Sequence, residues 1–234
     1  MRLSLCMCTM NERGAIAATI NAVREALPGH DIEFVITDSS TDGTAEIAEG
    51  MGARVIRQAP KGYGVALRES LMNASGDIVL TTDCDGTYPA GEFPRMVAMM
   101  GGGYDVVSGS RLKGRGRVKS MKLLNELGNR LFALMVSVLY GFECTDATTG
   151  MRAYRREVVQ GIEWTENTGL SLELLFKPAA LGYRVAEVPI GYSERVGTVK
   201  LNPWRGGLEM LVTILRCRVA PMRRRNATCP EPSG

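Results

Sequence analysis

The first half of the chain alternates short apolar runs with stretches whose apolar residues recur at helical spacing. The runs 3–8, 32–36, 53–57 and 78–82 predict strands, and the stretches 14–27, 45–51 and 63–74 predict the helices between them. Strands that alternate with helices at this rhythm are joined by right-handed crossovers into a parallel sheet. The pattern therefore predicts an α/β fold with a mostly parallel central sheet flanked by helices.

The second half is less regular. It predicts strands at 104–108 and 183–188, a short strand within 146–156, a basic loop at 110–122, and helices at 123–140, 170–181 and from Pro203 onward. We expect the apolar half of 123–140 to be core rather than membrane contact. The last helix carries Leu208, Leu211, Val212 and Leu215 on one face.

The chain length of 234 residues suits one domain with a sizeable core. We expect a single domain over 1–218, with a ligand-binding half at 1–109 and a second half at 110–218 that ends in a helical extension. The basic tail 219–234 is expected to be disordered.

Polar residues follow the predicted strands where each strand ends. Thr9 to Glu12, Asp38, and the pair Asp83 and Asp85 all take this position. Ligands of parallel sheets bind at the carboxyl ends of the strands, so we expect these groups on one rim. Asp83 and Asp85 point the same way in an extended segment, and two such carboxylates repel unless a cation lies between them. Mg²⁺ or Mn²⁺ is the natural occupant.

These motifs also fit other interpretations. A lone Asp-x-Asp could equally be an acidic turn that caps the next helix. Asp83-Cys84-Asp85-Gly86-Thr87 also matches the opening motif of haloacid-dehalogenase-like phosphatases, but the later aspartates, Asp105 and Asp146, form no acidic pair. Gly62-Tyr63-Gly64 begins like a dinucleotide fingerprint, yet Leu67 occupies the third glycine position.

Charge is unevenly distributed along the chain. The net charge is +3, but 111–122 holds six basic residues and 216–225 five, with no acid in either stretch. Such focused charge indicates a phosphate-bearing partner, whether a nucleotide, a nucleic acid or an anionic lipid. His30 is the only histidine and the six cysteines are scattered, which argues against a histidine-based zinc site or a Ser-His-Asp triad. Reduced thiols, no signal peptide and no spanning stretch predict a cytoplasmic protein.

Several motifs together resemble those of one enzyme family. They are Asp38-Ser39-Ser40-Thr41-Asp42-Gly43-Thr44, Lys61-Gly62-Tyr63-Gly64, Asp83-Cys84-Asp85, Asp146 to Arg152, Glu187-Val188-Pro189, and Arg195 to Lys200. In this order they resemble the inverting family-2 glycosyltransferases with the GT-A fold, above all synthases of dolichyl- or polyprenyl-phosphate mannose or glucose. The chain departs from that pattern at Cys8-Thr9-Met10 and Thr37, where the base and ribose would lie. UDP and GDP therefore both remain open.

The resemblance implies transfer of a hexose from a UDP- or GDP-sugar to a polyprenyl or dolichyl phosphate, assisted by Mg²⁺ or Mn²⁺. It implies roles for these residues: donor binding by Thr9, Asn11, Glu12, Asp38, Lys61, Gly62 and Asp83; metal binding by Asp85 with Asp83; and closure over the diphosphate or the acceptor phosphate by Arg195 and Lys200. Asp146 would act as a base or position the acceptor, and Glu173 is a second candidate base. Arg152 would pair with Asp146 or touch substrate.

Two alternatives define the limits of this interpretation. A soluble saccharide or natural-product acceptor would use the same donor site with Asp146 as a true base. A nucleic-acid-binding module would not need the carboxylates, and aromatic residues make up only 6% of the chain, so no nucleic-acid partner is expected. The basic stretches would instead hold the enzyme on the cytoplasmic face of an anionic membrane, at about 1 kcal/mol for each Lys or Arg. The sequence predicts no oligomeric state.

Overall fold

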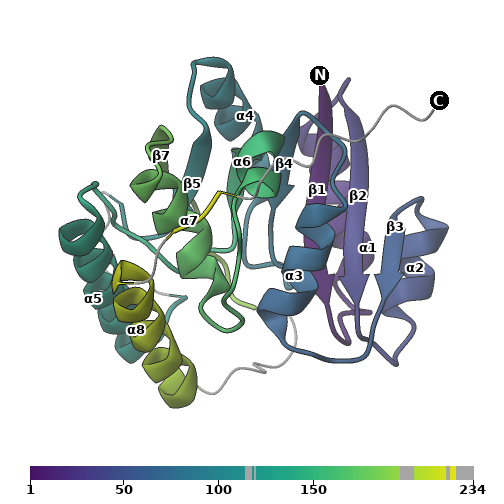
Figure 1. Cartoon of the computed structure of the whole chain (residues 1–234). Coiled ribbons are helices and arrows are strands. Elements are labelled where there is room, and N and C mark those ends of the chain that lie inside the picture. The colour runs from purple at the N-terminus through teal and green to yellow at the C-terminus, as the bar shows by residue number, and fades with distance from the viewer. Residues whose placement is uncertain (114–117, 119, 196–202, 220–221, 225–234) are drawn as a thin grey trace, which may run out of the picture.

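A seven-stranded sheet forms the centre of the protein (Figure 1). The computed structural model describes residues 1–113, 118, 120–195, 203–219 and 222–224, without the side chains of 203–205. The strands are β1 (Arg2–Thr9), β2 (Asp31–Asp38), β3 (Arg54–Arg57), β4 (Ile78–Thr81), β5 (Val106–Ser110), β6 (Arg152–Arg155) and β7 (Val185–Pro189). Their order is β3-β2-β1-β4-β6-β5-β7, and every pairing is parallel except those of β6 with β4 and β5.

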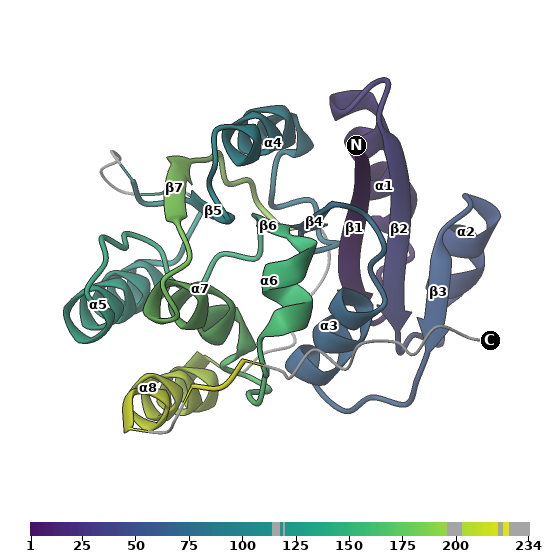
Figure 2. The same ribbon diagram turned by 45° about the horizontal axis from the view of Figure 1, so that its top comes forward.

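Both sides of the sheet are covered by helices (Figure 2). Alternate residues of β1 point to opposite sides: Leu3, Leu5 and Met7 join one core, and Cys6 joins the other. The first core contains α1 (Ile16–Ala26), α2 (Thr44–Gly50) and α4 (Phe93–Gly101), which follows the short helix η1 (Ala90–Glu92). The second contains α3 (Tyr63–Met72), α6 (Arg156–Gly161) and α7 (Leu170–Ala180).

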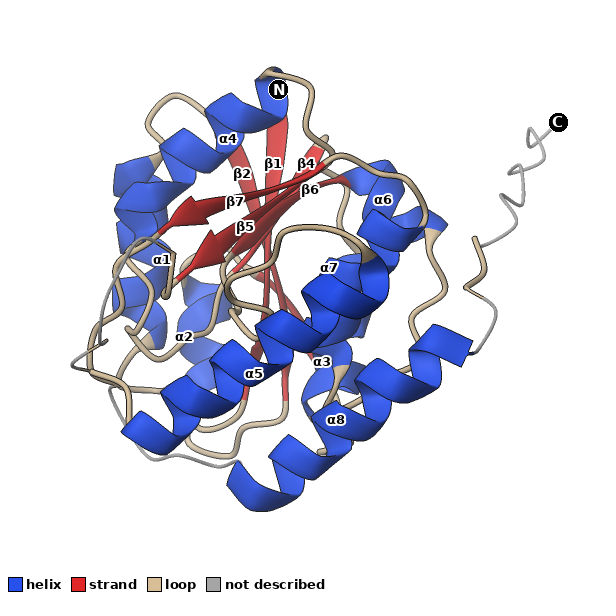
Figure 3. Cartoon of the chain, turned by 90° about the vertical axis from the view of Figure 1, so that its left-hand side faces the viewer, coloured by secondary structure: helices blue, strands red, loops and turns tan. Residues whose placement is uncertain are grey.

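Two further helices lie outside α7. They are α5 (Leu123–Tyr140) and α8 (Pro203–Val219), which lie side by side (Figure 3). Their inner residues, including Ala133, Val136 and Ile214, pack with Phe176 in a third cluster. Because α7 is covered by the sheet on one side and by this pair on the other, Leu170–Pro178 are all buried.

The antiparallel strand β6 decides which loops meet. Thr81, the last residue of β4, pairs with Arg152, the first residue of β6. The segment that leads into β6 therefore lies at the edge where β4 and β5 end. In this way residues 145–151, from the second half of the chain, reach the same rim as Asp83 and Asp85.

The predicted α/β fold with its mostly parallel sheet is confirmed, and each predicted strand is present within a few residues of the expected bounds. Helices α4 and α6 were not predicted. The exposure of the outer helices corrects a further expectation: within the apolar half of α5 only part is core, since Leu131, Leu134 and Val138 are exposed. Leu208, Val212 and Leu215 of α8 also face solvent.

Some expectations are not tested by the fold. The division into halves at residue 109/110 stays a prediction, and residues 225–234 of the tail lie outside the described part. The basic loop is described at 111–113, 118 and 120–122. Within the described residues no helix combines the length and apolar character needed to cross a bilayer.

Candidate functional site

The carboxyl ends of β1 and β2 form one wall of the site. Thr9 and Asp38 are paired at the end of the two strands, and the Thr9 hydroxyl donates to Asp38 Oδ1 at 2.6 Å. Ser40 adds two donors to the same carboxylate, its hydroxyl to Oδ1 at 2.6 Å and its N–H to Oδ2 at 2.9 Å. Asp38 is thus buried and fixed in orientation.

The next residues hold the β1 and β2 loops together. Asn11 has a φ of 55°, the left-handed region that asparagine tolerates better than most residues. This conformation lets its N–H donate to the Ser40 hydroxyl at 2.7 Å while its side-chain oxygen accepts from the Thr41 N–H at 2.9 Å. The predicted base- and ribose-binding residues Thr9, Asn11, Glu12 and Asp38 therefore come together; their binding role stays a prediction.

Asp85 connects this wall to the exit of β4. Its Oδ1 accepts from the Thr87 hydroxyl at 2.6 Å and the Thr87 N–H at 3.1 Å, which leaves Oδ2 turned toward Arg195 Nη1 at 3.3 Å. The other terminal nitrogen of Arg195 lies 3.6 Å from Glu12 Oε1. One guanidinium thus bridges two of the predicted site carboxylates.

Asp83, the first aspartate of the Asp-x-Asp turn, packs against Gly150. A Cβ at Gly150 would come within 2.8 Å of Asp83 Oδ2, so a glycine is required for the two loops to pack. Burial and then the nearby Asp85 charge raise the pKa of Asp83 to about 6, although Arg111, Arg195 and Arg152 oppose the shift. A buried carboxylate beside a second one is stabilised in its charged form by a cation.

The Asp83–Asp85 pair fits a hard divalent ion. Both residues offer carboxylate oxygens, the ligands that Mg²⁺ and Mn²⁺ prefer, and two carboxylates leave coordination positions for phosphate oxygens. The arginine at Asp85 Oδ2 already marks a place where positive charge is stabilised. The residues present are therefore suitable for the predicted metal.

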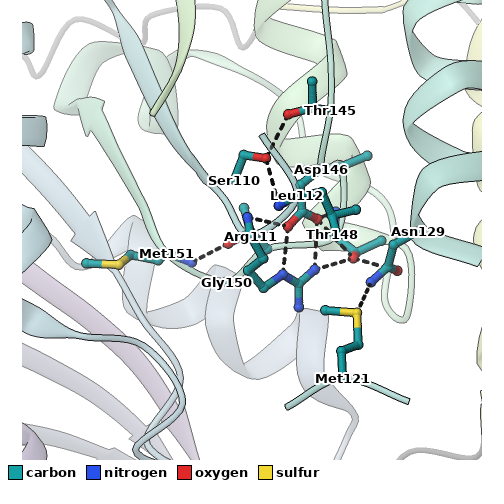
Figure 4. A network of polar contacts seen from close by, with 12 residues as sticks. Ser110, Arg111, Leu112, Met121, Asn129, Thr145, Asp146, Thr148, Gly150 and Met151 are labelled. Atoms are coloured by element: carbon teal, nitrogen blue, oxygen red, sulfur yellow. Dashed lines mark hydrogen bonds and ion pairs between the residues drawn. The ribbon is translucent and has the colours of Figure 1, made fainter. Parts of the chain in front are cut away.

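Asp146 forms the opposite wall and is bound by an arginine (Figure 4). The Nε of Arg111 lies 2.6 Å from Asp146 Oδ2, and its Nη2 lies 2.8 Å from Oδ1, a bidentate pair. Nη2 also donates to the Thr148 hydroxyl at 2.7 Å, which donates to Asn129 Oδ1 on α5 at 2.8 Å. Burial alone would raise the pKa of Asp146, but Arg111 outweighs it and the pKa is lowered.

A half-buried glutamate fixes the loop that carries Asp146. Glu187, on β7, accepts from the N–H and hydroxyl of Thr145 and from the N–H of Asp146. Arg152 does not pair with Asp146 as one expectation had it. Its Nε donates to the Ser108 hydroxyl and its Nη2 to the Ala147 carbonyl, so this fully buried arginine braces the backbone before β6.

The glycine loop is shaped by Asn167. A Cβ at Gly62, whose φ is 104°, would meet the Asn167 side chain at 2.3 Å. Asn167 also accepts from the Gly64 N–H and donates to the Lys61 carbonyl. Packing explains the glycines, while nucleotide binding by Lys61 and Gly62 stays a prediction. Lys200 lies outside the described residues.

Glu173 belongs to a different cluster. Among the described residues, Glu166, Glu173 and Cys217 are close enough to share a metal ion. However, Glu173 is ion-paired with Lys177 and accepts from the Thr165 N–H and hydroxyl and the Glu166 N–H, and Glu166 is paired with Arg216. These contacts balance the cluster's charge and tie α7 to α8, away from the rim. They explain Glu173 as a structural residue rather than a base.

Sequence reasoning missed the role of Arg111. It was counted with the basic surface, yet it is only 6% exposed, and its guanidinium lies 5.1 Å from the centroid of Tyr192. Its position does carry a signal: Arg111 directly follows β5, so the rule that gathers ligands at strand ends would have selected it.

Comparisons with known proteins agree with this arrangement. Residues 4–162 match the model of the family described as Glycosyl transferase family 2. A dolichyl-phosphate hexose transferase from Haloferax volcanii is 48% identical over 215 residues, 92% of each chain. An undecaprenyl-phosphate mannosyltransferase from Micrococcus luteus is 28% identical and covers 94% of this chain and 95% of its own.

A solved structure shows the same fold with ligands. Glucosyl-3-phosphoglycerate synthase from Mycobacterium tuberculosis, in complex with Mn²⁺, UDP-glucose and glycerol 3-phosphate, has a TM-score of 0.72 at 26% identity and covers 94% of this chain and 81% of that one. The resemblance drawn from the motifs is confirmed. The chain belongs to glycosyltransferase family 2 and is a glycosyltransferase of the GT-A fold.

Proposed function

We propose that this enzyme transfers a hexose from a nucleotide diphosphate sugar to a polyprenyl or dolichyl phosphate, with inversion at the anomeric carbon and with the help of Mg²⁺ or Mn²⁺. Support for the acceptor comes from the two relatives whose names specify transfer to dolichyl or undecaprenyl phosphate. Support for the donor and the metal comes from the related structure that contains UDP-glucose and Mn²⁺.

The observation that carries the choice of acceptor is the bidentate Arg111–Asp146 pair. A carboxylate held in this way, with its pKa lowered, is a poor general base. A saccharide hydroxyl would need such a base, whereas a phosphate monoester has a second pKa near 6 and is already a nucleophile at neutral pH. The site therefore suits a phosphate acceptor better than the saccharide alternative.

Arg111 supplies what a phosphate acceptor needs. Its Nε and Nη2 are engaged by Asp146 and Thr148, and within the described residues no hydrogen bond is found for Nη1. We assign this nitrogen to the acceptor phosphate, with Asp146 as the group that positions the guanidinium. Arg195 would leave Asp85 and Glu12 to contact the diphosphate or the acceptor phosphate, and Lys200 would join it.

The reaction proposed is a single displacement. An acceptor phosphate oxygen forms the bond to the anomeric carbon while the bond from that carbon to the donor diphosphate breaks, and the nucleoside diphosphate leaves on the opposite side. No proton has to be removed from the acceptor. Asp85 with Asp83 would hold the metal, which when bound neutralises the charge that develops on the leaving group.

The test is a transfer assay with a panel of UDP- and GDP-sugars and three acceptors: a short-chain polyprenyl phosphate, the matching polyprenol, and a free hexose. We expect a glycosylated product only with the phosphate, and only when Mn²⁺ or Mg²⁺ is supplied. Asp85→Asn should abolish metal-dependent donor binding, and Glu25→Gln, at an exposed position of α1, serves as the matched control. Transfer to the hexose but not to the phosphate would favour the soluble-acceptor alternative and defeat the proposal.

The basic stretches support a peripheral position on an anionic membrane, although fewer of their residues can contact lipid than the sequence alone implies. Arg111 is buried against Asp146, and Arg216 is paired with Glu166. Lys122, Arg218 and Arg223 are exposed and can be attracted to anionic lipid, whereas Arg224 donates to the Leu181 carbonyl.

A further inference from the structure

Exposed apolar side chains are concentrated on α5 and α8. Twelve large hydrophobic residues of the described chain are exposed, and all but Met1 and Met10 belong to these two helices. The ten are Leu123, Leu124, Leu127, Leu131, Leu134 and Val138 on α5, and Leu208, Val212, Leu215 and Val219 on α8. We call them the α5–α8 apolar surface. A monomeric soluble protein rarely exposes so contiguous an apolar surface without a binding partner.

The spacing shows that these residues form stripes. On α5, positions 124, 127, 131, 134 and 138 recur at alternating steps of three and four, and on α8 positions 208, 212, 215 and 219 do the same. Such residues share one side of a helix. The two helices lie next to each other (Figure 3), and their opposite sides are buried in the cluster with α7. Because the residues of both stripes are exposed, the stripes face outward.

The exposed charges described on the α5–α8 apolar surface are basic, and two of them, Arg130 and Arg216, are ion-paired with Glu126 and Glu166. The exposed charged residues described on these helices are Arg130, Arg216 and Arg218, with Lys122 just before α5. The acids of the helices are Glu126, which is buried, and Glu209, which is half-buried; the exposed Glu143 comes after α5 has ended. An apolar stripe with a basic margin is the signature of a helix that lies in a membrane interface.

The surface also adjoins the acceptor side of the active site. Asn129, on the inner side of α5, accepts a hydrogen bond from Thr148, which is bonded to Arg111. Leu127 and Leu131 lie on the outer side of the same turns. A helix with its side chains is about 10–12 Å across. The leucines and Arg111 are therefore separated by the width of α5 and by the side chains of Asn129 and Thr148.

The structure assigns the α5–α8 apolar surface as a membrane-docking surface whose leucines and valines insert among the lipids while the flanking lysine and arginines remain at the headgroups. This deepens the proposed function and rests on it, because it names how the enzyme reaches a lipid-borne phosphate. It also predicts binding that salt does not abolish. Attraction through basic residues alone would be screened, since the Debye length falls to about 3 Å at 1 M salt.

The test is flotation of the full chain with phosphatidylcholine vesicles that contain no acceptor and with no donor present. We expect binding that persists in about 1 M NaCl. The triple substitution Leu127→Gln, Leu131→Gln and Leu134→Gln should reduce vesicle partitioning by about tenfold or more, because the apolar transfer free energy is lost. Glu25→Gln is again the control. Because the three leucines are 54–61% exposed, the triple variant should keep the thermal stability of the parent.

A second measurement guards against misfolding. Leu134→Trp should be quenched by brominated phosphatidylcholine above the background of the native tryptophans, whereas Glu25→Trp should not. Absence of vesicle binding, binding unaffected by the triple substitution, or a dimer in sedimentation that the triple substitution dissociates without any vesicle binding would each overturn the assignment. Transfer to a detergent-solubilised short-chain phosphate separates the two ideas: it must survive in the triple variant if only docking is lost, and it fails in the parent if the proposed function is wrong.

Discussion

The role of Arg111 depends on its burial, which its place in the sequence does not show. Arg111 is one of six basic residues within twelve positions of chain, and composition alone assigns them all to a charged surface. The fold separates it from the others, because it is the first residue after β5 and its backbone N–H donates to Asp146 Oδ2 at 3.0 Å. Burial, which composition does not report, turns a surface charge into part of the site.

Arg111→Lys tests this role. Lysine keeps the charge but cannot form the two parallel hydrogen bonds to Asp146 or present a fixed nitrogen to the acceptor. We expect the KM for a polyprenyl phosphate to rise about tenfold to a hundredfold, the equivalent of one charged hydrogen bond, while the KM for the donor changes little. Arg130→Lys, at an exposed arginine of α5, is the comparison. A higher KM for the donor instead would place Arg111 on the nucleotide side.

Helices and strands were predictable where the periodicity was long. The strand-and-helix alternation of the first half and the bounds of α5 follow from apolar spacing. Helix α4 was missed because Pro94 and Gly101 to Gly103 suggest a loop, although Pro94 lies in the first turn, where proline is tolerated. Apolar spacing could not predict which side of α5 faces the core, because a helix with apolar residues on all sides does not specify which stripe is buried.

At the scale of elements, the hydrogen bonds between α8 and Glu166, in the loop before α7, predict how the free energy of unfolding depends on pH. Burial would raise the pKa of Glu166, but hydrogen bonds from Arg216 and Thr213 outweigh it and lower the pKa. A lowered pKa means that this tie stabilises the folded state above the unfolded pKa of about 4.3 and is lost as the pH falls below it. Glu166→Gln should therefore cost about 1–2 kcal/mol at pH 7, toward the lower end because Arg216 is largely exposed, and less at pH 3.

Urea unfolding at the two pH values measures this difference. Glu157→Gln, at an exposed position of α6, controls for the loss of one negative charge. A cost that is the same at pH 3 and pH 7 would show that packing, rather than the charged hydrogen bonds, holds α8.

For the whole molecule, the carboxylates of three chain segments meet two arginines, Arg111 and Arg195, at one edge of the sheet. Asp38 and the pair Asp83 and Asp85 were expected on one rim. The contact of Asp83 with Gly150 and the pairing of β4 with β6 bring the loop that carries Asp146 to the same edge. The sequence could assign Asp38, Asp83 and Asp85 to strand ends, whereas Asp146 lies in the turn before β6. It could not show that Asp146 is paired with Arg111 rather than Arg152, because that choice depends on how an antiparallel strand brings two loops together.

Ligand binding at this edge should stabilise the entire domain. With UDP or GDP at about 100 times its Kd and Mn²⁺ present, the gain is about 2.7 kcal/mol. For a domain of this size, that corresponds to a rise in Tm of roughly 5–10 °C. Differential scanning fluorimetry measures it, with EDTA as one control and single-stranded DNA as another. Stabilisation by DNA alone would point to nucleic-acid binding instead.

The contact between Gly150 and Asp83 also constrains how such enzymes can be redesigned. Gly150 belongs to the loop proposed to bind the acceptor, and Asp83 to the loop proposed to bind the donor. The Asp83 carboxylate nevertheless packs directly against the backbone of Gly150. A loop grafted before β6 to change the acceptor would replace the backbone at Gly150 and would therefore shift the Asp83 carboxylate. Exchanges between relatives should therefore move the turn after β4 and the turn before β6 as one unit.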